Sequence, residues 1–210
     1  QEFECAFMEH AAQVFPIELI RTVEDPAASF GPYETRTPNP LFVGIDIGRR
    51  KDLTVAWTLE RVEGVLWTRE ILVLENTPFP EQEAILAERV ARARYIAIDS
   101  TGMGGPISEH LAKRLGDYKL DAVNFTNERK RELFSRAKKA FQSKTVRIPN
   151  HPKLRDDLAS IQRIVTPQGL VKFIAARTKD GHADRATALA LAMHAAEKIP
   201  EGMGLSEQAP

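Results

Sequence analysis

Apolar residues recur along the chain in patterns that alternate between those of strands and those of helices. Two short, continuous apolar runs, residues 41–46 and 95–99, predict buried strands, and each run ends in an acid. Residues 54–59 and 65–74 are rich in β-branched and aromatic residues and flank Val62-Glu63-Gly64, which predicts a hairpin. Strands that come first, followed by strand–helix alternation, predict an α/β domain with a mixed sheet.

The second part of the chain carries the helical spacing. Apolar residues three and four positions apart predict helices over residues 79–93, 107–115, 128–141, 153–161 and 183–199. Short β-rich runs between them predict strands at residues 120–125, 145–148 and 170–175. Three antiparallel strands followed by parallel crossovers is the order found in ribonuclease H-like domains, so we expect a mixed sheet of that kind with helices on both faces.

The two ends of the chain differ from the middle. Residues 1–40 hold a short amphipathic piece, residues 2–12, followed by five prolines. These prolines argue against regular structure, because each one fixes φ and removes a hydrogen-bond donor. We interpret residues 1–40 as a linker or the tail of a preceding domain, residues 41–198 as the folded domain and residues 199–210 as a flexible tail. The start without Met suggests a piece of a longer protein.

Composition narrows the class of protein. The 210 residues are 43% hydrophobic and 28% charged, and 29 basic side chains balance 29 acidic ones, which excludes a histone-like protein but not a locally basic groove. The single cysteine, Cys5, excludes an intramolecular disulfide and a cysteine-based zinc site, and it fits a reducing cytoplasm. No run of 18 apolar residues and no basic signal-peptide region occurs, so we expect no membrane span and no secretion.

The placement of acids is the most informative feature. Asp46 and Asp99 each end an apolar strand, and ligands gather at the carboxyl ends of strands in open α/β sheets. Two adjacent parallel strands would bring these carboxylates together, where they repel each other. A divalent cation such as Mg²⁺ or Mn²⁺ would relieve that repulsion, because hard cations prefer oxygen ligands.

A third acid comes from the start of the last helix. Asp184 lies in its first turn, where the helix dipole favours a negative group, and Asp180 falls in the loop before Gly181. Taken alone, Asp46 could be a turn former and Asp184 an ordinary N-terminal helix residue. Taken together, Asp46, Asp99 and Asp184 are better explained by a metal site, with Asp180 as a further candidate ligand.

Other polar and aromatic residues have simpler explanations. His182 could lie beside the metal, although a loop histidine next to a helix cap explains it as well. Phe134 and Phe141, at helical spacing, are expected in the core. The remaining acids are interpreted as loop, turn or solvated helix residues: Asp52, Asp117, Asp121, Asp156 and Asp157.

Basic residues gather in two places that could bind phosphates. Arg49, Arg50 and Lys51 follow Asp46 directly. The other cluster falls on the helix expected over 128–141, with Lys130, Arg131, Lys138 and Lys139. A solvated helix face explains that cluster equally well, but its excess of positive charge favours DNA. No motif that reads bases is present, so we expect little sequence specificity.

At these residues the sequence resembles the nuclease domain of terminase large subunits from tailed phages of the Mu-like kind. The similarity covers about residues 41–198 and rests on three elements: Gly44-Ile45-Asp46-Ile47-Gly48, Ala97-Ile98-Asp99-Ser100-Thr101-Gly102, and Gly181-His182-Ala183-Asp184 leading into Ala188-Leu189-Ala190-Leu191-Ala192. The resemblance implies a ribonuclease H-like metal-dependent endonuclease that cuts concatemeric viral DNA during genome packaging. It places Asp46, Asp99 and Asp184 at the three acidic positions, with Asp180 as a looser, accessory candidate.

The resemblance also implies a cellular and molecular setting. In two-metal hydrolysis of a phosphodiester a carboxylate lies between the two divalent ions, and we expect Asp46 to be that carboxylate. The resemblance implies products with a 5′-phosphate and a 3′-hydroxyl. Residues 1–40 would be the end of a packaging ATPase and its linker, although no Walker A pattern occurs in this chain. The expected partners are double-stranded DNA, the ATPase domain of the same full-length chain, the portal and the small terminase subunit, in the host cytoplasm.

Three other functions remain open at this point. An actin-like or sugar-kinase-like phosphotransferase also begins with an Asp-x-Gly turn, as in Asp46-Ile47-Gly48, but normally needs two such halves. A junction resolvase or transposase of the same fold would share the metal chemistry and differ in substrate. A docking domain of the packaging motor without catalysis is the alternative that is not an enzyme.

Overall fold

The computed structural model describes residues 11–48, 53–102, 104–175 and 183–201. Its main feature is a six-stranded mixed sheet. In spatial order the strands are β6 (Leu120–Val123), β5 (Tyr95–Asp99), β2 (Leu41–Asp46), β3 (Thr54–Val62), β4 (Val65–Leu74) and β7 (Val146–Arg147). Strands β2, β5 and β6 are parallel, whereas β3 is antiparallel to both β2 and β4. The predicted mixed sheet and hairpin are confirmed.

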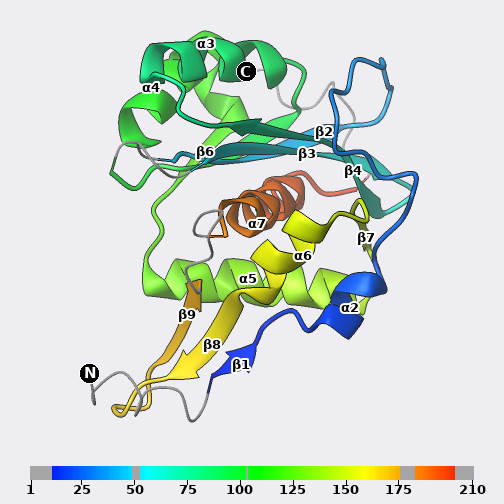
Figure 1. Ribbon diagram of the computed structural model, residues 1–210. Coiled ribbons are helices and arrows are strands. Elements are labelled where there is room, and N and C mark those ends of the chain that lie inside the picture. The colour runs from blue at the N-terminus through cyan, green and yellow to red at the C-terminus, as the bar shows by residue number, and fades with distance from the viewer. Residues whose placement is uncertain (1–10, 49–52, 103, 176–182, 202–210) are drawn as a thin grey trace.

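Helices cover both faces of this sheet, as predicted (Figure 1). One face carries α3 (Phe79–Arg89) and α4 (Gly104–Leu115). The other face carries α7 (Asp184–Glu197), with α5 (Asn127–Gln142) and α6 (Pro152–Ala159) packed beyond it. A 3₁₀ turn, η1 (Asp117–Lys119), leads into β6. Helix α7 is therefore enclosed between the sheet and α5.

The composition of α7 explains why it can occupy this central position. Alanine and leucine are spread around the whole helix, and nearly all of its residues are buried. A Cβ at Gly44 of β2 would overlap the backbone of Ala188 and Ala192, so the missing side chain allows the strand and helix to approach closely. Within the described ranges, no helix is long and apolar enough to cross a membrane.

A second, smaller sheet was predicted only in part. It has the order β1 (Ala12–Gln13), β8 (Ile161–Val165), β9 (Val171–Ala175), and only β9 corresponds to a predicted strand. The prediction that a helix runs to Ile161 was wrong, because α6 ends at Ala159 and, after Ser160, the chain is extended from Ile161 onward. From Gln162 to Val165, half-buried and exposed residues alternate, which is the period of a strand with one covered face.

The stretch before β2 is more ordered than its prolines suggest. The prediction that residues 1–40 lack regular structure was wrong for β1 and for α2 (Ile17–Arg21). Pro16 occupies the N-cap of α2, where a missing N–H costs nothing. Phe15, Ile20 and Val23 are buried in the core shared with α5 and α7. Ile199, the first residue of the expected tail, is buried in the same core.

Candidate active site

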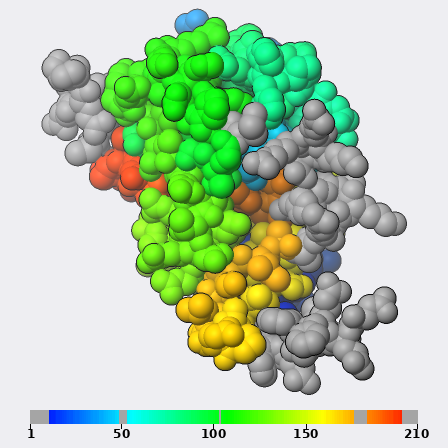
Figure 2. Space-filling view, turned by 90° about the vertical axis from the view of Figure 1, so that its left-hand side faces the viewer, coloured from blue at the N-terminus to red at the C-terminus, as the bar shows by residue number. Residues whose placement is uncertain are grey.

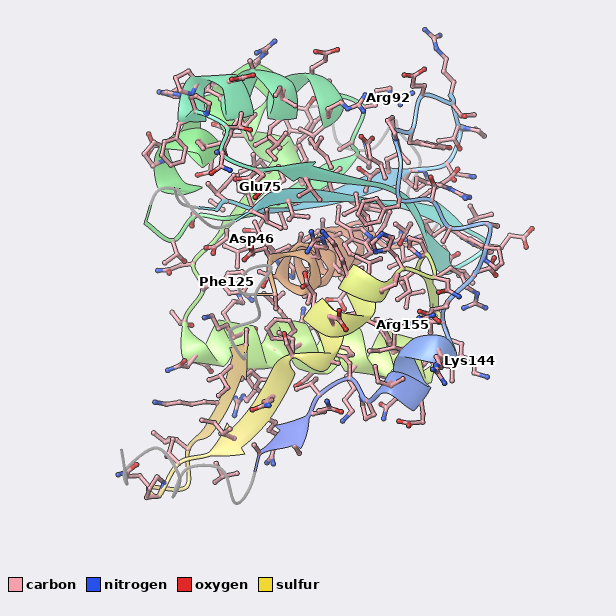
Figure 3. All side chains as sticks on the ribbon, in the orientation of Figure 1. Asp46, Glu75, Arg92, Phe125, Lys144 and Arg155 are labelled. Atoms are coloured by element: carbon pink, nitrogen blue, oxygen red, sulfur yellow. The ribbon has the colours of Figure 1, made fainter. Side chains whose placement is uncertain are left out.

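Two of the predicted acids lie side by side at one edge of the sheet. Asp46 is the last residue of β2 and Asp99 the last of β5, and Ile45 pairs with Ile98 in the parallel register just before them. Figure 3 shows Asp46 at this edge, next to the beginning of α7. The strand pairing predicted from the two apolar runs therefore brings these carboxylates together.

Asp184 reaches the same edge from α7, the helix that packs on one face of the sheet. It is the first residue of α7 and is buried, with 7% of its surface exposed. Its Oδ2 accepts a hydrogen bond of 3.0 Å from the backbone N–H of Leu53, which precedes β3. Ala183 before it has a left-handed backbone with φ of 64°, a conformation rare outside glycine. The helix start is thus fixed against the strand next to β2.

The three carboxylates interact electrostatically. Burial raises the pKa of Asp46 well above its ordinary value of 3.8, and the charges of Asp184 and Asp99 raise it further. Two weaker influences lower the pKa of Asp46, the positive charge of Lys130 and a hydrogen bond from Thr187. The ionised form of Asp46 is therefore disfavoured in this site unless a cation lies close to it.

A cavity of about 230 Å³ opens beside Asp46 and Asp99. Its polar lining residues are Asp46, Asp99, Thr101, Lys130 and Thr187, and its apolar ones are Phe125, Phe134, Ile161, Phe173 and Ala175. The apolar residues come from α5, the β8–β9 hairpin and the loop before α5. Figure 2 looks at this end of the molecule and shows α5 in green beside the hairpin in yellow and orange.

The residues present suit a divalent cation by their chemistry. The lining offers carboxylate oxygens, which Mg²⁺ and Mn²⁺ prefer, and a cation would compensate the burial and the neighbouring negative charges that raise the pKa of Asp46. Within the residues that the structure describes, no three His, Cys, Asp or Glu side chains form a group that could hold a metal ion as they stand. Asp180, the fourth predicted ligand, lies outside those residues.

Hydrogen bonds and close packing hold the loop after β5 in place. The backbone N–H of Thr101 donates to Asp99 Oδ1 at 2.8 Å, which orients that carboxyl group. Gly104 begins α4 directly behind it, where a Cβ would overlap the carbonyl of Asp99. The threonine at 101 also connects to the next segment, because its hydroxyl accepts a bond of 2.9 Å from the N–H of Phe125.

A buried ion pair anchors the beginning of α7. Arg185 Nη1 lies 3.1 Å from Asp157 Oδ2 of α6, and both side chains are almost completely buried. The interpretation of Asp157 as a residue of a solvated helix face was wrong, whereas the adjacent Asp156 is exposed as expected. Because Arg185 follows Asp184 directly, this pair helps to determine where the Asp184 carboxylate lies.

The predicted basic residues separate into two groups. Lys130 lines the cavity, whereas Arg131 and Lys139 are exposed on α5 and Lys138 is half-buried there. Arg49, Arg50, Lys51 and His182 lie outside the described residues. Phe134 and Phe141 are buried, so their prediction as core residues is confirmed.

Sequence reasoning missed three contributors to the site. Thr187 lies one helical turn after Asp184, so helical spacing from that acid could have indicated it. The hydrogen bond from the Leu53 N–H and the ion pair of Arg185 with Asp157 could not be predicted from the sequence, because both depend on contacts between distant segments.

A larger cavity of about 550 Å³ lies at the opposite edge of the sheet, near Arg61, Arg94 and Ile199. Arg61 donates hydrogen bonds to the carbonyls of Ala196 and Ile199, which satisfies the end of α7. None of the three predicted acids lines this cavity, so we place the chemistry at the smaller one.

Comparisons with known proteins agree with the predicted resemblance. The family model described as the terminase RNaseH-like domain matches residues 43–196. The chain is 30% identical over 168 residues to the probable terminase large subunit gp28 of Escherichia phage Mu, covering 75% of this chain and 30% of that protein. It is 28% identical over 160 residues to the Mu-like prophage FluMu protein gp28 of Haemophilus influenzae, covering 72% of this chain and 31% of that protein. The chain thus spans less than a third of the length of these relatives.

Solved structures share the fold. The large terminase nuclease of the thermophilic phage G20c with bound magnesium has a TM-score of 0.67 at 21% identity, covering 87% of this chain and 96% of that one. The large terminase nuclease domain of Thermus phage P74-26 has a TM-score of 0.65 at 20% identity, covering 86% and 94%. The large terminase of bacteriophage HK97 has a TM-score of 0.60 at 14% identity, covering 91% of this chain but 47% of that one. With its ribonuclease H-like mixed sheet and the matching family model, the chain belongs to the terminase RNaseH-like domain family.

Proposed function

We propose that this chain hydrolyses phosphodiester bonds of double-stranded DNA with the help of divalent cations. The observation that carries the proposal is the meeting of Asp46, Asp99 and Asp184 at one edge of the sheet, where burial and the charges of the other two acids raise the pKa of Asp46. Negative charge concentrated beside a cavity lowers the stability of the fold, and a carboxylate–metal site accounts for its presence. Family membership and the magnesium-bound nuclease among the similar structures support the same chemistry.

Asp46, Asp99 and Asp184 would hold the divalent ions, with Asp180 as an accessory ligand. The described acids do not form a metal-holding group by themselves, so we expect their side chains to close on the ion as it binds. The chemistry that Mg²⁺ or Mn²⁺ would supply there is a lower pKa for a water molecule and stabilisation of the leaving oxygen. Related nucleases with bound magnesium, cobalt and zinc are consistent with a divalent ion.

The surrounding residues would keep the acids in place while this happens. The N–H of Leu53 would orient Asp184 and the N–H of Thr101 would orient Asp99, which holds both carboxylates at this edge of the sheet before an ion binds. The Thr187 hydroxyl does the same for Asp46. Hydrolysis at this site would leave a 5′-phosphate and a 3′-hydroxyl.

DNA would approach along α5. Lys130 at the cavity and the side chains of Arg131, Lys138 and Lys139 farther along the helix would contact phosphates, together with Arg49, Arg50 and Lys51. Such contacts are independent of sequence, so we expect cutting with little preference for particular bases.

The longer relatives suggest the biological setting. In a full-length terminase large subunit, this domain would cut concatemeric viral DNA during packaging, joined to an ATPase domain and working with the portal and the small terminase subunit. The site of action would be the cytoplasm of the host cell. The family match disfavours a phosphotransferase, and a junction resolvase or transposase would be distinguished by its DNA substrate.

The test is cleavage of supercoiled plasmid by the chain with Mg²⁺, Mn²⁺ or EDTA. We expect nicked and linear products with either metal, none in EDTA, and ends that DNA ligase can rejoin because they carry 5′-phosphates. Asp46→Ala should abolish cutting. Glu75→Ala, which removes an exposed carboxylate just after β4, should leave cutting unchanged.

Two outcomes would contradict the proposal. Plasmid that stays intact with every metal would remove the nuclease from this chain. Cutting that persists in EDTA or in the Asp46→Ala variant would show that the activity does not come from the carboxylate site.

A further inference from the structure

One cationic side chain reaches the acid-lined cavity within the described parts of the chain. Lys130 lines the cavity together with Asp46 and Asp99, and its charge is near enough to lower the pKa of Asp46. The other lysines and arginines of α5 are absent from the cavity lining. Lys130 therefore occupies a different environment from the rest of the basic cluster.

The register of α5 explains this difference. Lys130 lies four residues before Phe134 and seven before Ala137, both of which are buried against the core. It therefore belongs to the inward face of the helix, but at the end nearest the acids. Residues 131 and 139 belong to the exposed part of the helix.

The position of Lys130 is supported from two sides. The side chain of Thr126 accepts a hydrogen bond from the N–H of Arg129 and caps the helix just before the lysine. The Lys130 ammonium lies 5.8 Å from the ring centre of Phe125, a cation–π contact that directs it along the cavity wall. Figure 3 shows Phe125 next to Asp46 at this end of the molecule.

We infer that Lys130 is a catalytic residue, whose ammonium group contacts the phosphate that is being cut, and not only one of several DNA-gripping lysines. This inference rests on the proposed function and names one further participant in it. In hydrolysis, the oxygen of water bonds to phosphorus while the bond from phosphorus to O3′ breaks. O3′ leaves with the electron pair and takes up a proton, and the proton lost by the water passes to solvent. The phosphate gains negative charge on the way, and an ammonium fixed beside it stabilises that charge.

The inference predicts that loss of Lys130 lowers the rate of cleavage, whereas loss of the other lysines lowers the affinity for DNA. In single-turnover cleavage at saturating DNA and Mg²⁺, we expect Lys130→Met to lower the rate about 100-fold, as loss of one stabilising group in an active site does. Lys130→Arg should recover a large part of that rate. Lys138→Met should raise the DNA concentration needed for half-maximal rate while leaving the saturated rate unchanged. Lys113→Met, on the exposed end of α4 across the sheet, is the control for losing a surface lysine.

A second measurement excludes a merely structural role. Calorimetric titration of Mg²⁺ into Lys130→Met without DNA should show affinity equal to or tighter than that of the unchanged chain, because a positive charge next to Asp46 has been removed. Weaker Mg²⁺ binding would show that Lys130 only supports the acids, and would overturn the inference. A wild-type saturated rate in Lys130→Met would overturn it as well. If the unchanged chain itself does not cut, the proposed function fails first and the inference fails with it.

Discussion

Asp46 is a carboxylate whose surroundings oppose its ionisation. Its pKa is raised in the folded chain, so metal-free protein gains stability from this group below about pH 4 and loses it as pH rises through the raised value. At pH 7, Asp46→Asn should therefore raise the melting temperature of metal-free protein, by about 2–4 °C for each kcal/mol of relieved repulsion.

The same substitution should remove the response to metal. Mg²⁺ should raise the melting temperature of the unchanged chain but not of Asp46→Asn, because the variant lacks the charge that the ion compensates. Thermal unfolding with Mg²⁺ and with EDTA measures both effects, and Glu75→Gln is the matched control. A lower melting temperature for metal-free Asp46→Asn would contradict the electrostatic account of this site.

The three acids could be identified from the sequence, but the groups that hold them in position could not. Asp46 and Asp99 end apolar runs, so the fold class alone brings them to one edge of the sheet. Asp157 gave the opposite impression, because a pair of acids on an eight-residue helix suggests a solvated face. Its burial depends on the ion pair with Arg185, 28 positions away, and no local sequence pattern indicates such a pair.

Among the contacts between helices and strands, the one between β2 and α7 determines where the site lies. Gly44→Ala would force a methyl group into the backbone of α7, so the strand and helix must separate. We expect a loss of about 3 kcal/mol in the free energy of unfolding. The displaced helix start should also carry Asp184 away from Asp46, so cleavage should fall more than the folded fraction does.

Urea unfolding and plasmid cleavage measure the two effects of Gly44→Ala. Gly31→Ala is the control, because no atom lies within 4 Å of a Cβ at that position. Equal stability of the two variants would show that the close approach of β2 and α7 is not a constraint.

A polar contact also joins β6 to α7. His194 Nε2 and Lys198 Nζ lie 2.8 Å and 3.1 Å from Asp121 Oδ2, and the hydrogen bond from His194 is the main cause that lowers the Asp121 pKa to about 2. Because this pKa is below the ordinary value of 3.8, the stabilisation is complete above about pH 4 and is lost as pH falls towards 2.

Asp121→Asn should therefore reduce the free energy of unfolding by about 1 kcal/mol at pH 7 and make little difference near pH 2. Urea unfolding across this pH range, with the exposed Asp117→Asn as control, gives the comparison. A penalty that stays constant down to pH 2 would show that the contact does not depend on the charge of Asp121.

Local patterns predicted the central elements better than the peripheral ones. Strands β2 and β5 are covered on both faces and read as continuous apolar runs, so their sequence identifies them. Strand β8 follows α6 after a single residue, so its first residue, Ile161, continues the apolar spacing of the helix and predicts a helix that extends past Ala159. Helix α2 has only five residues and is preceded by Pro16, so its sequence does not predict it; the packing of Phe15 and Ile20 in the core stabilises it.

At the scale of the whole molecule, a formal net charge of zero makes the placement of charge decisive for DNA binding. Acids occupy the edge where β2 and β5 end, while lysines and arginines of α5 extend away from it. Helices α3 and α4 cover the other face of the sheet, across from α7 and α5 (Figure 1). On the proposed function, DNA at the acids would therefore be held by a few lysines and arginines at one side.

This arrangement predicts how salt affects DNA binding. Each phosphate contact contributes about 0.9 to the slope of the logarithm of affinity against the logarithm of salt concentration. Replacing both Lys138 and Lys139 by Met should therefore lower the magnitude of that slope by about 2. Replacing Lys113 and Arg114, exposed at the end of α4, removes the same charge from the opposite face and should leave the slope unchanged. Fluorescence anisotropy with labelled duplex DNA in EDTA measures both slopes. Equal losses in the two double variants would mean that DNA responds to total charge, and that α5 is not the surface along which it reaches the acids.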